Sequence, residues 1–156
     1  MTDRSISHGS FVIERSYPAH PAKVFGAWAD GAAKETWMDD PDYKSDGGKY
    51  ELDFRVGGHE RFGGVTPEGQ AYRYEGVIYD IVPDQRIVYS YEMYNGQDLG
   101  SVSLATVQIV AEGSGTRLTY TEQDAFLDGI EKPEDREQLG WMFDNFGKYL
   151  ESQAGH

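Results

Sequence analysis

The chain has 156 residues, a length that fits one folded domain with its own hydrophobic core. It contains no cysteine, which excludes disulfides, thiolate zinc sites and cysteine nucleophiles. Its formal net charge of −13 argues against nucleic acid as a partner, because nucleic-acid binding begins with a positively charged surface. We therefore expect a single domain over residues 1–156 that does not bind nucleic acid.

The N-terminal residues lack the apolar segment of a secretory signal. Residues 1–9 are mostly polar and are predicted to form a flexible tail. No later run of apolar residues approaches the length that crosses a bilayer. The sequence therefore predicts a cytoplasmic protein without a membrane partner.

The chain after this tail predicts one strand followed by two short helices. Residues 11–17 alternate in character, with Phe11 and Ile13 on one face, which is typical of a half-buried strand. Pro21 suits the first position of a helix, and Gly31 ends that helix before a second short turn over residues 32–37. We expect these two helices to help cover a sheet formed by the strands that follow.

The middle of the chain predicts a sheet with short connections. Turn-forming residues recur at short intervals after Gly48, as expected for hairpins. Between them lie six runs of strand-like composition, over residues 49–56, 59–65, 70–82, 86–94, 101–111 and 116–122. Successive runs most simply pair as an antiparallel meander. With residues 11–17, the predicted sheet has about seven strands.

Residues 133–150 form the one long helical pattern in the sequence. Its apolar stripe consists of Leu139, Phe143, Phe146 and Leu150. Gly140 and Gly147 lie on one flank of the stripe, and the bulkier Met142 and Tyr149 lie on the other. Because a glycine inside a helix is unfavourable, we expect another part of the chain, most simply sheet backbone, close against this thin flank. The pattern favours an α+β fold in which a curved sheet wraps around the long C-terminal helix.

Several segments together resemble one known superfamily. They are residues 15–28, 53–58, 74–83, 86–91 and 115–122, with Trp37, Gly140 and Trp141. In order and spacing they resemble the START-like (SRPBCC, Bet v 1-like helix-grip) superfamily, and within it the branch of the activator of Hsp90 ATPase homologue 1. The resemblance implies a seven-stranded antiparallel sheet around the last helix, two short helices closing one end, and a cavity between. It implies no particular reaction, because members include lipid and hormone binders as well as polyketide cyclases and aromatases.

The sequence contains no recognisable catalytic or metal-binding motif. The histidines, His8, His20, His59 and His156, are scattered and lack the spacing of metal ligands. No Gly-x-Ser-x-Gly segment marks a serine nucleophile. We therefore predict no catalytic residue, no metal and no cofactor.

Aromatic residues are the feature most suggestive of a ligand site, since they make up 13% of the chain. We predict an apolar pocket between the C-terminal helix and the concave sheet face, in which tyrosine hydroxyls orient the ligand. Its predicted lining is Phe54, Tyr89, Tyr91, Met93, Val107, Tyr120, Met142, Phe143 and Phe146. Alternatively, the hydroxyls bind backbone carbonyls or water, and the methionines fill the space. Arg55 and Glu75 are weaker candidates, because charged residues on strands usually face solvent.

Three functions are compatible with these features. The first is a binding protein for an apolar or aromatic small molecule, because the predicted fold encloses a cavity and no catalytic motif is visible. The second is a polyketide cyclase or aromatase-like enzyme, since such a site can act by orienting a reactive chain. The third, suggested by the branch name, is a co-chaperone that contacts Hsp90 and stimulates its ATPase.

Overall fold

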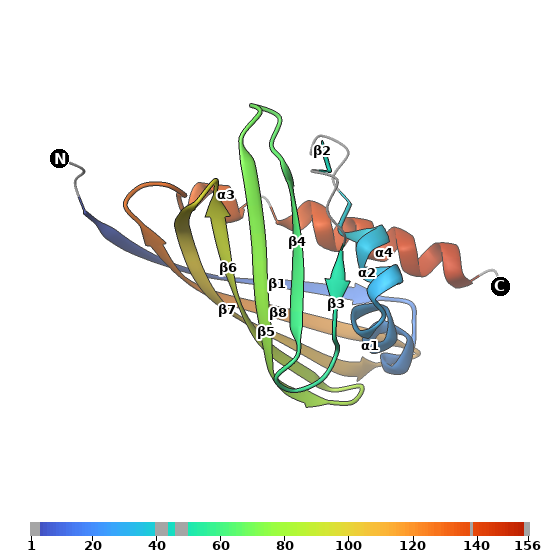
Figure 1. The fold of residues 1–156 in the computed structure, drawn as a ribbon. Coiled ribbons are helices and arrows are strands. Elements are labelled where there is room, and N and C mark those ends of the chain that lie inside the picture. The colour runs from blue at the N-terminus through green and yellow to red at the C-terminus, as the bar shows by residue number, and fades with distance from the viewer. Residues whose placement is uncertain (1–3, 40–43, 46–49, 138, 155–156) are drawn as a thin grey trace.

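The computed structural model describes residues 4–39, 44–45, 50–137 and 139–154 (Figure 1). The elements follow in the order β1 (Ile6–Tyr17), α1 (Pro21–Ala29), α2 (Gly31–Trp37), β2 (Lys44–Ser45), β3 (Glu51–Leu52), β4 (His59–Val65), β5 (Ala71–Val82), β6 (Arg86–Asn95), β7 (Asp98–Glu112), β8 (Gly115–Leu127), α3 (Glu134–Glu137) and α4 (Gly140–Ala154). The predicted α+β class is confirmed. No helix in the described ranges is long and apolar enough to cross a bilayer.

One curved antiparallel sheet contains all the strands. Its order is β1-β8-β7-β6-β5-β4-β2, and β3 also pairs with β4. The chain therefore forms a meander from β4 to β8, and β1 adds at the far edge by pairing with β8. Irregularities in register lie in β5 between Ile78 and Asp80, and in β6 between Met93 and Tyr94. Bulges of this kind increase the twist of a sheet, and Figure 1 shows β4 and β5 crossing the direction of β1 and β8.

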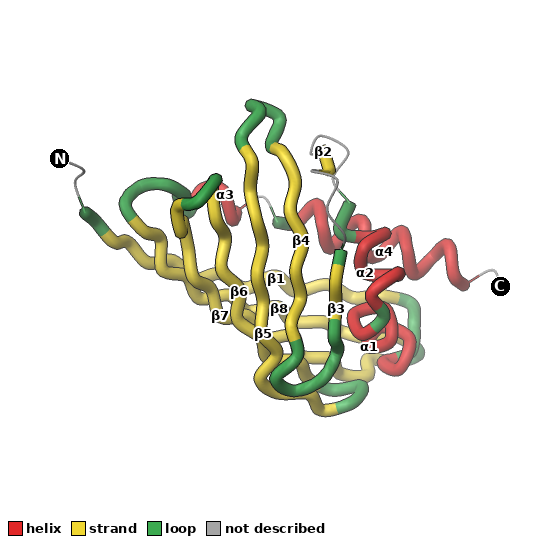
Figure 2. Tube along the Cα trace, viewed as in Figure 1, coloured by secondary structure: helices red, strands yellow, loops and turns green. Residues whose placement is uncertain are grey.

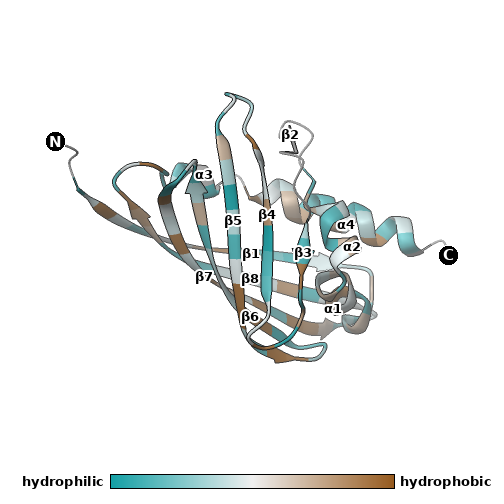
Figure 3. Ribbon diagram, viewed as in Figure 1, coloured by the Kyte–Doolittle hydropathy of each residue, from teal (hydrophilic) through white to brown (hydrophobic). Residues whose placement is uncertain are grey.

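Alternating residues of the central strands form the buried, concave face of the sheet. Buried positions include Ile87, Tyr89 and Tyr91 on β6, Ala105, Val107 and Ile109 on β7, and Leu118 and Tyr120 on β8. These are the inward residues that period-two alternation predicts. Figure 3 shows the matching pattern, in which hydrophobic and hydrophilic colours alternate along the strands.

Helix α4 fills the concave face with the predicted apolar stripe. Phe143 and Phe146 are fully buried, and Leu150 is nearly so. The ring of Phe146 lies 4.9 Å from that of Trp37 on α2 and 5.1 Å from that of Tyr17 on β1. Helices α1 and α2 lie together at one end of the sheet, and both contact α4 (Figure 2). Aromatic side chains therefore pack the last helix against the sheet and against α2.

The glycines of α4 face β1, as the thin flank suggests, but they meet side chains and not sheet backbone. A Cβ atom at Gly147 would lie 3.2 Å from the ring of Tyr17, and one at Gly140 would lie 3.3 Å from the Arg15 guanidinium. The hydroxyl of Tyr17 donates a hydrogen bond to the carbonyl of Phe143 at 3.0 Å. The neighbour of this flank is therefore a tyrosine side chain and not the expected sheet backbone. This tyrosine both packs against α4 and hydrogen-bonds to it.

The boundaries of two predicted segments differ from the structure. The strand predicted over residues 49–56 is reduced to β3, and residue 49 lies outside the described ranges. Residues after β3 form a tight turn in which the Gly58 N–H donates to the Arg55 carbonyl. The predicted long helix is divided into α3 and α4, and residue 138 between them is not described. A short-range hydrogen bond from the Met142 N–H to the Leu139 carbonyl marks the start of α4.

The predicted N-terminal tail is also shorter than residues 1–9. Strand β1 begins at Ile6, because its backbone pairs with β8 as far as Leu127. Just before it, Ser5 donates a backbone hydrogen bond to the Asp128 carboxylate and accepts one from the Asp128 N–H. Residues 1–3 lie outside the described ranges. Pairing with a distant strand therefore orders residues whose own composition predicts no structure.

The stripe on α4 predicts the effect of shortening its aromatic side chains. Phe143→Ala and Phe146→Ala should each lower the free energy of unfolding by about 3–5 kcal/mol, the usual cost of a cavity left by a buried phenylalanine. Urea denaturation measures the loss. Val12→Ala, on the exposed side of β1, should cost less than about 1 kcal/mol and serves as the control. Losses below about 1 kcal/mol for both phenylalanine variants would contradict this account of the core.

Candidate functional site

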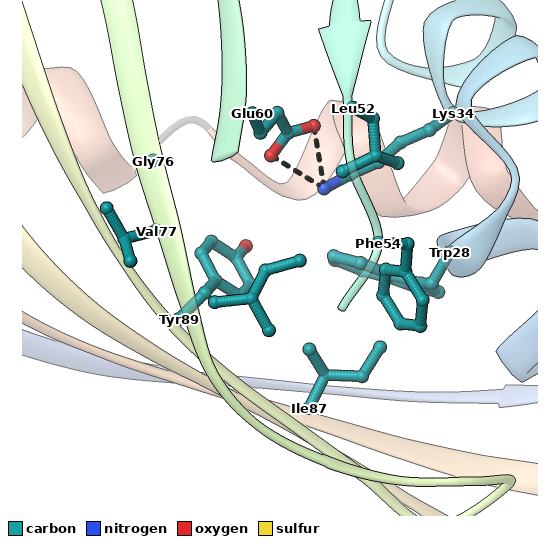
Figure 4. Close-up of a pocket in the computed structure, with 10 residues that line it drawn as sticks. Trp28, Lys34, Leu52, Phe54, Glu60, Gly76, Val77, Ile87 and Tyr89 are labelled. Atoms are coloured by element: carbon teal, nitrogen blue, oxygen red, sulfur yellow. Dashed lines mark hydrogen bonds and ion pairs between the residues drawn. The ribbon is translucent and has the colours of Figure 1, made fainter. Parts of the chain in front are cut away.

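A small interior pocket lies between the helix pair α1–α2 and strands β3 to β6 (Figure 4). Its lining residues are Trp28, Lys34, Leu52, Phe54, Glu60, Gly76, Val77, Ile78, Ile87 and Tyr89. The cavity measures about 10 Å³, which is roughly the space that one water molecule needs. The lining residues come from α1, α2 and the sheet. The pocket is therefore closer to α1 and α2 than to α4, beside which the sequence analysis predicted it.

A buried ion pair forms the polar part of this pocket. The ammonium of Lys34, on α2, lies 2.9 Å from both carboxylate oxygens of Glu60, on β4. Their side chains are only 7% and 4% exposed. The hydroxyls of Tyr50 and Tyr74 also donate hydrogen bonds to Glu60. These extra bonds satisfy the carboxylate, which a buried ion pair requires to offset its loss of hydration.

Aromatic rings enclose the same ammonium. The Lys34 nitrogen lies 5.1 Å from the centre of the Trp28 ring and 5.3 Å from that of Tyr89. At such distances the negative faces of the rings attract a cation. Burial raises the pKa of Tyr74 well above its usual value, and the neighbouring Glu60 carboxylate acts in the same direction. Tyr74 is therefore a hydrogen-bond donor to Glu60 throughout the physiological range.

A second polar cluster surrounds Glu122 on β8, which is fully buried. The hydroxyls of Tyr91 and Tyr120 donate hydrogen bonds to one of its oxygens, at 2.6 and 2.5 Å. Burial raises the pKa of Glu122 to about 8, and its hydrogen bond with Asp124 has the same effect, whereas the two tyrosine hydroxyls oppose it. At neutral pH the Glu122 side chain therefore mainly carries a proton.

Arg136 from α3 completes this cluster. Its guanidinium lies 2.7 Å from Glu131, 2.7 Å from the hydroxyl of Ser101 and 3.5 Å from Glu122. The Nε atom of Arg136 and the Oε2 atom of Glu122 both lack a hydrogen-bond partner within the described residues. We call Tyr91, Ser101, Ser103, Tyr120, Glu122, Asp124, Glu131 and Arg136 the Glu122 cluster. Its three carboxyl groups and single guanidinium give it excess negative charge, which also favours a proton on Glu122.

Tyrosine side chains connect the pocket with the Glu122 cluster. The ring of Tyr74, at the Glu60 end, stacks on that of Tyr91 with the ring centres 4.9 Å apart. The ring centre of Tyr89, which lines the pocket, lies 6.3 Å from that of Tyr91. Tyr91 in turn donates to Glu122. The two polar regions are therefore linked by packed tyrosine rings through the interior.

The predicted ligand-binding residues fall into three groups in the structure. Phe54 and Tyr89 line the pocket. Tyr91 and Tyr120 hydrogen-bond to Glu122, in place of the backbone carbonyl or water that was the alternative expectation. The other predicted residues belong to the packed core or its edge: Met93, Val107, Met142, Phe143 and Phe146. Contact of any of the nine with a ligand stays a prediction.

The sequence analysis did not identify the four charged residues at the centre of the two polar regions. These are Lys34, Glu60, Glu122 and Arg136. The alternation in β8 contains a signal for Glu122, because it follows Tyr120 by two residues and so shares the inward face. The weaker candidates lie elsewhere: Arg55 pairs with Asp53 on the surface, and Glu75 pairs with surface arginines. Within the described ranges no group of histidine, aspartate and glutamate side chains could hold a metal ion, and His156 lies outside those ranges.

The buried ion pair predicts an asymmetry between single and double variants. Glu60→Leu leaves the Lys34 ammonium buried without its partner and should lower the free energy of unfolding by about 3–5 kcal/mol. The double variant Lys34→Met/Glu60→Leu should recover most of this loss, as measured by urea denaturation. Glu75→Leu is the matched control on the neighbouring strand, and its surface pairs should contribute less than about 1 kcal/mol. Equal losses in Glu60→Leu and Glu75→Leu would contradict the assigned burial.

The raised pKa of Glu122 predicts how stability changes with pH. Between about pH 4.5 and pH 8 the folded state holds a proton on Glu122 that the unfolded chain has lost. The stability from this group is therefore present below pH 4.5 and declines as the pH rises to about 8. The loss is on the order of 1 kcal/mol for each pH unit across that window. Denaturation of wild type and Glu122→Gln from pH 4 to pH 9 measures it, because the glutamine cannot titrate. A constant difference between the two proteins would refute the raised pKa.

Comparisons with known proteins agree with this architecture. A solved structure of a putative uncharacterized protein from Rhizobium leguminosarum has 40% identity and a TM-score of 0.90, over 97% of this chain and 99% of that one. The Mll3558 protein from Rhizobium loti has 42% identity and a TM-score of 0.83, over 93% of this chain and 99% of that one. No curated protein matches the chain.

More distant structures share the fold. The AHSA1 (SPO3351) protein from Silicibacter pomeroyi is 21% identical, with a TM-score of 0.71 over 93% of this chain and 99% of that one. A family model described as "Activator of Hsp90 ATPase homolog 1-like protein" matches residues 18–153. This match covers most of the chain, including both N-terminal helices and α4. The chain therefore belongs to the family of Activator of Hsp90 ATPase homolog 1-like proteins and has the helix-grip fold expected from the resemblance.

Proposed function

We propose that the protein binds a small apolar or aromatic molecule in the interior pocket beside Lys34 and Glu60. The observation that carries this proposal is a charged, hydrogen-bonded pair exposed to a cavity whose other walls are mainly aromatic and aliphatic. Small-molecule sites commonly combine an apolar lining with a few fixed polar groups.

The ion pair supports a role in recognition because stability alone does not account for it. Well-packed apolar residues in place of a buried pair are often as stabilising as the pair itself. At this position the pair instead keeps polar atoms beside the cavity, and Glu60 is held by two tyrosine hydroxyls as well as by Lys34. A polar group fixed in this way can orient a ligand without rearranging first.

The chemistry of the pocket favours an uncharged ligand with a flat ring. Lys34 and Glu60 neutralise each other, so a charged ligand would add a buried charge that has no counterion. The rings of Trp28 and Tyr89 supply flat apolar surfaces. An aromatic molecule can cover these surfaces, and aromatic pairs are favourable beyond the area that they bury.

A ligand larger than one water must displace side chains, and the pocket has one wall suited to this. Leu52 and Phe54 line it from β3 and the turn that follows, and both are only partly buried. Phe54 packs edge-on against Phe25, also partly buried, with the ring centres 5.7 Å apart. Movement of these residues leaves the core around Phe143 intact. We therefore place the entrance at β3, next to α1.

Ligand binding can be tested with small ring compounds and a blocked pocket. Ethylbenzene and indole should raise the melting temperature of wild type, because a ligand that binds only the folded state stabilises it. Leu52→Trp should abolish this increase by filling the pocket from its movable wall. Isothermal titration calorimetry on the same proteins gives the affinities.

Leu104→Trp is the matched control for this experiment. Leu104 is 42% exposed on β7 and lies outside the pocket, so the same substitution there should leave the temperature increase unchanged. The proposal is wrong if neither compound stabilises wild type. It is also wrong if Leu52→Trp and Leu104→Trp respond alike.

A further inference from the structure

We propose that Lys34 forms a covalent imine with an aromatic aldehyde that enters the pocket, and that Glu60 carries the protons of this reaction. The inference rests on the proposed function, because the aldehyde must first reach the pocket as a small ring compound. It goes further by naming the ligand class and by giving the buried ion pair a chemical role. The two groups meet only in the folded chain, since they come from α2 and β4.

The side chains around Lys34 are arranged as an amine nucleophile with its own proton acceptor. Lys34 lines the pocket, and its nitrogen lies 2.9 Å from both oxygens of Glu60 (Figure 4). The hydroxyls of Tyr50 and Tyr74 hold that carboxylate in place by donating hydrogen bonds to it. Activated nucleophiles commonly have this order, in which a base lies within hydrogen-bond reach and a third group orients the base.

A lysine at the pocket, in contrast to the other buried cation, is what distinguishes this pair from a structural one. Arg136 pairs with a carboxylate in the Glu122 cluster, and it does not line the pocket. A guanidinium keeps its proton in proteins, whereas an ammonium can lose one and become a nucleophile. Lys23, Lys132 and Lys148 are exposed. Among the lysines whose burial the structure describes, Lys34 is therefore the one beside an interior cavity.

Burial of the pair makes the free amine easier to form. In its charged form the pair places two opposite charges in the interior, on side chains that are 7% and 4% exposed. Transfer of one proton along the 2.9 Å hydrogen bond from Lys34 to Glu60 leaves two neutral groups. Because burial disfavours the charged form of both groups, this transfer costs less here than in water. The resulting amine has the lone pair that attacks a carbonyl carbon.

The reaction conserves atoms and charge and needs no oxidant or reductant. The Lys34 nitrogen forms a bond to the aldehyde carbon, and the carbonyl oxygen takes the proton held by Glu60. Glu60 then removes a second proton from the nitrogen and gives it to the new hydroxyl. The C–O bond breaks, water leaves, and the nitrogen lone pair forms the C=N bond. The product is a protonated imine, so the positive charge stays beside the Glu60 carboxylate.

This charge balance favours aldehydes over other electrophiles. An aldehyde enters uncharged, and its product keeps Glu60 paired. An ester would instead convert Lys34 to a neutral amide and leave Glu60 as a buried charge without a counterion. The imine cation also keeps the attraction of the Trp28 and Tyr89 rings, whose centres lie 5.1 and 5.3 Å from the lysine nitrogen. An aldehyde is smaller than the matching ketone, which suits a cavity of about 10 Å³.

Benzaldehyde labelled with ¹³C at its carbonyl carbon tests the inference on the full chain. In wild type an imine carbon signal should appear in the NMR spectrum beside that of the free aldehyde. Lys34→Arg keeps a cation beside Glu60 but cannot form the imine, so this signal should be lost. Lys148→Arg, at an exposed lysine of α4, is the matched control and should keep it. No imine signal in wild type, or an undiminished one in Lys34→Arg, would overturn the proposal.

Reductive trapping locates the imine in wild type and so does not depend on the folding of a variant. Sodium cyanoborohydride converts an imine to a stable amine, and peptide mass spectrometry then identifies the benzylated lysine. The label on Lys34 should exceed that on Lys148 by about tenfold, because binding in the pocket holds the aldehyde beside the amine. Excess ethylbenzene should reduce the label on Lys34 alone. Equal labelling of the two lysines would overturn the proposal.

These results separate the inference from the proposed function. If ethylbenzene and indole stabilise wild type but Lys34 forms no imine, the pocket binds ring compounds and this inference alone is wrong. If neither compound stabilises wild type, and Leu52→Trp leaves the label on Lys34 unchanged, both are wrong. A merely structural ion pair would change the stability of its variants. It would not direct the label to Lys34.

Discussion

Trp28 is the packing centre on which the rest of the structure depends. Its ring lies within 6.5 Å of the ring centres of Trp37, Tyr89, Tyr120, Phe143 and Phe146. These contacts join α1 to α2, β6, β8 and α4 around one side chain. Large aromatic residues bury much apolar surface with few rotatable bonds, so they can hold several elements in a fixed arrangement. The helices that close one end of the sheet and the helix that it grips are therefore parts of one core.

This aromatic core encloses ionisable groups, which sets a second constraint on the fold. Lys34 and Glu60 at one end, and Glu122 and Arg136 at the other, are all less than 10% exposed. A buried charge is tolerated only when it is paired and hydrogen-bonded, and the tyrosine hydroxyls supply many of those bonds. The tyrosines thus have two roles, because their rings belong to the core and their hydroxyls satisfy the carboxylates. The proposed ligand pocket follows from this double role.

Local patterns in the sequence were sufficient to predict the order and type of most elements. The alternation in β6, β7 and β8 identifies the buried faces because side chains of a strand point to opposite sides with period two. The stripe containing Phe143 and Phe146 identifies the gripped face of α4 because helical residues three and four apart share a side. These properties depend only on neighbouring residues. The α+β class and the helix-grip arrangement could therefore be predicted, and the motifs that resemble the family support the same fold.

Only the tertiary structure decided which distant residues meet. Lys34 and Glu60 are 26 positions apart in the chain, and Tyr91 and Glu122 are 31 apart, so no local pattern relates them. Local patterns also do not predict that residues 6–9 form a strand, because this strand depends on pairing with β8. Nor do they predict the aromatic packing that leaves so small a cavity. The sequence by itself determined which side chains face inward on the long strands and on α4. The structure determined which inward charges pair, because the packing of α2 and α3 against the sheet brings them together and burial makes an unpaired charge too costly.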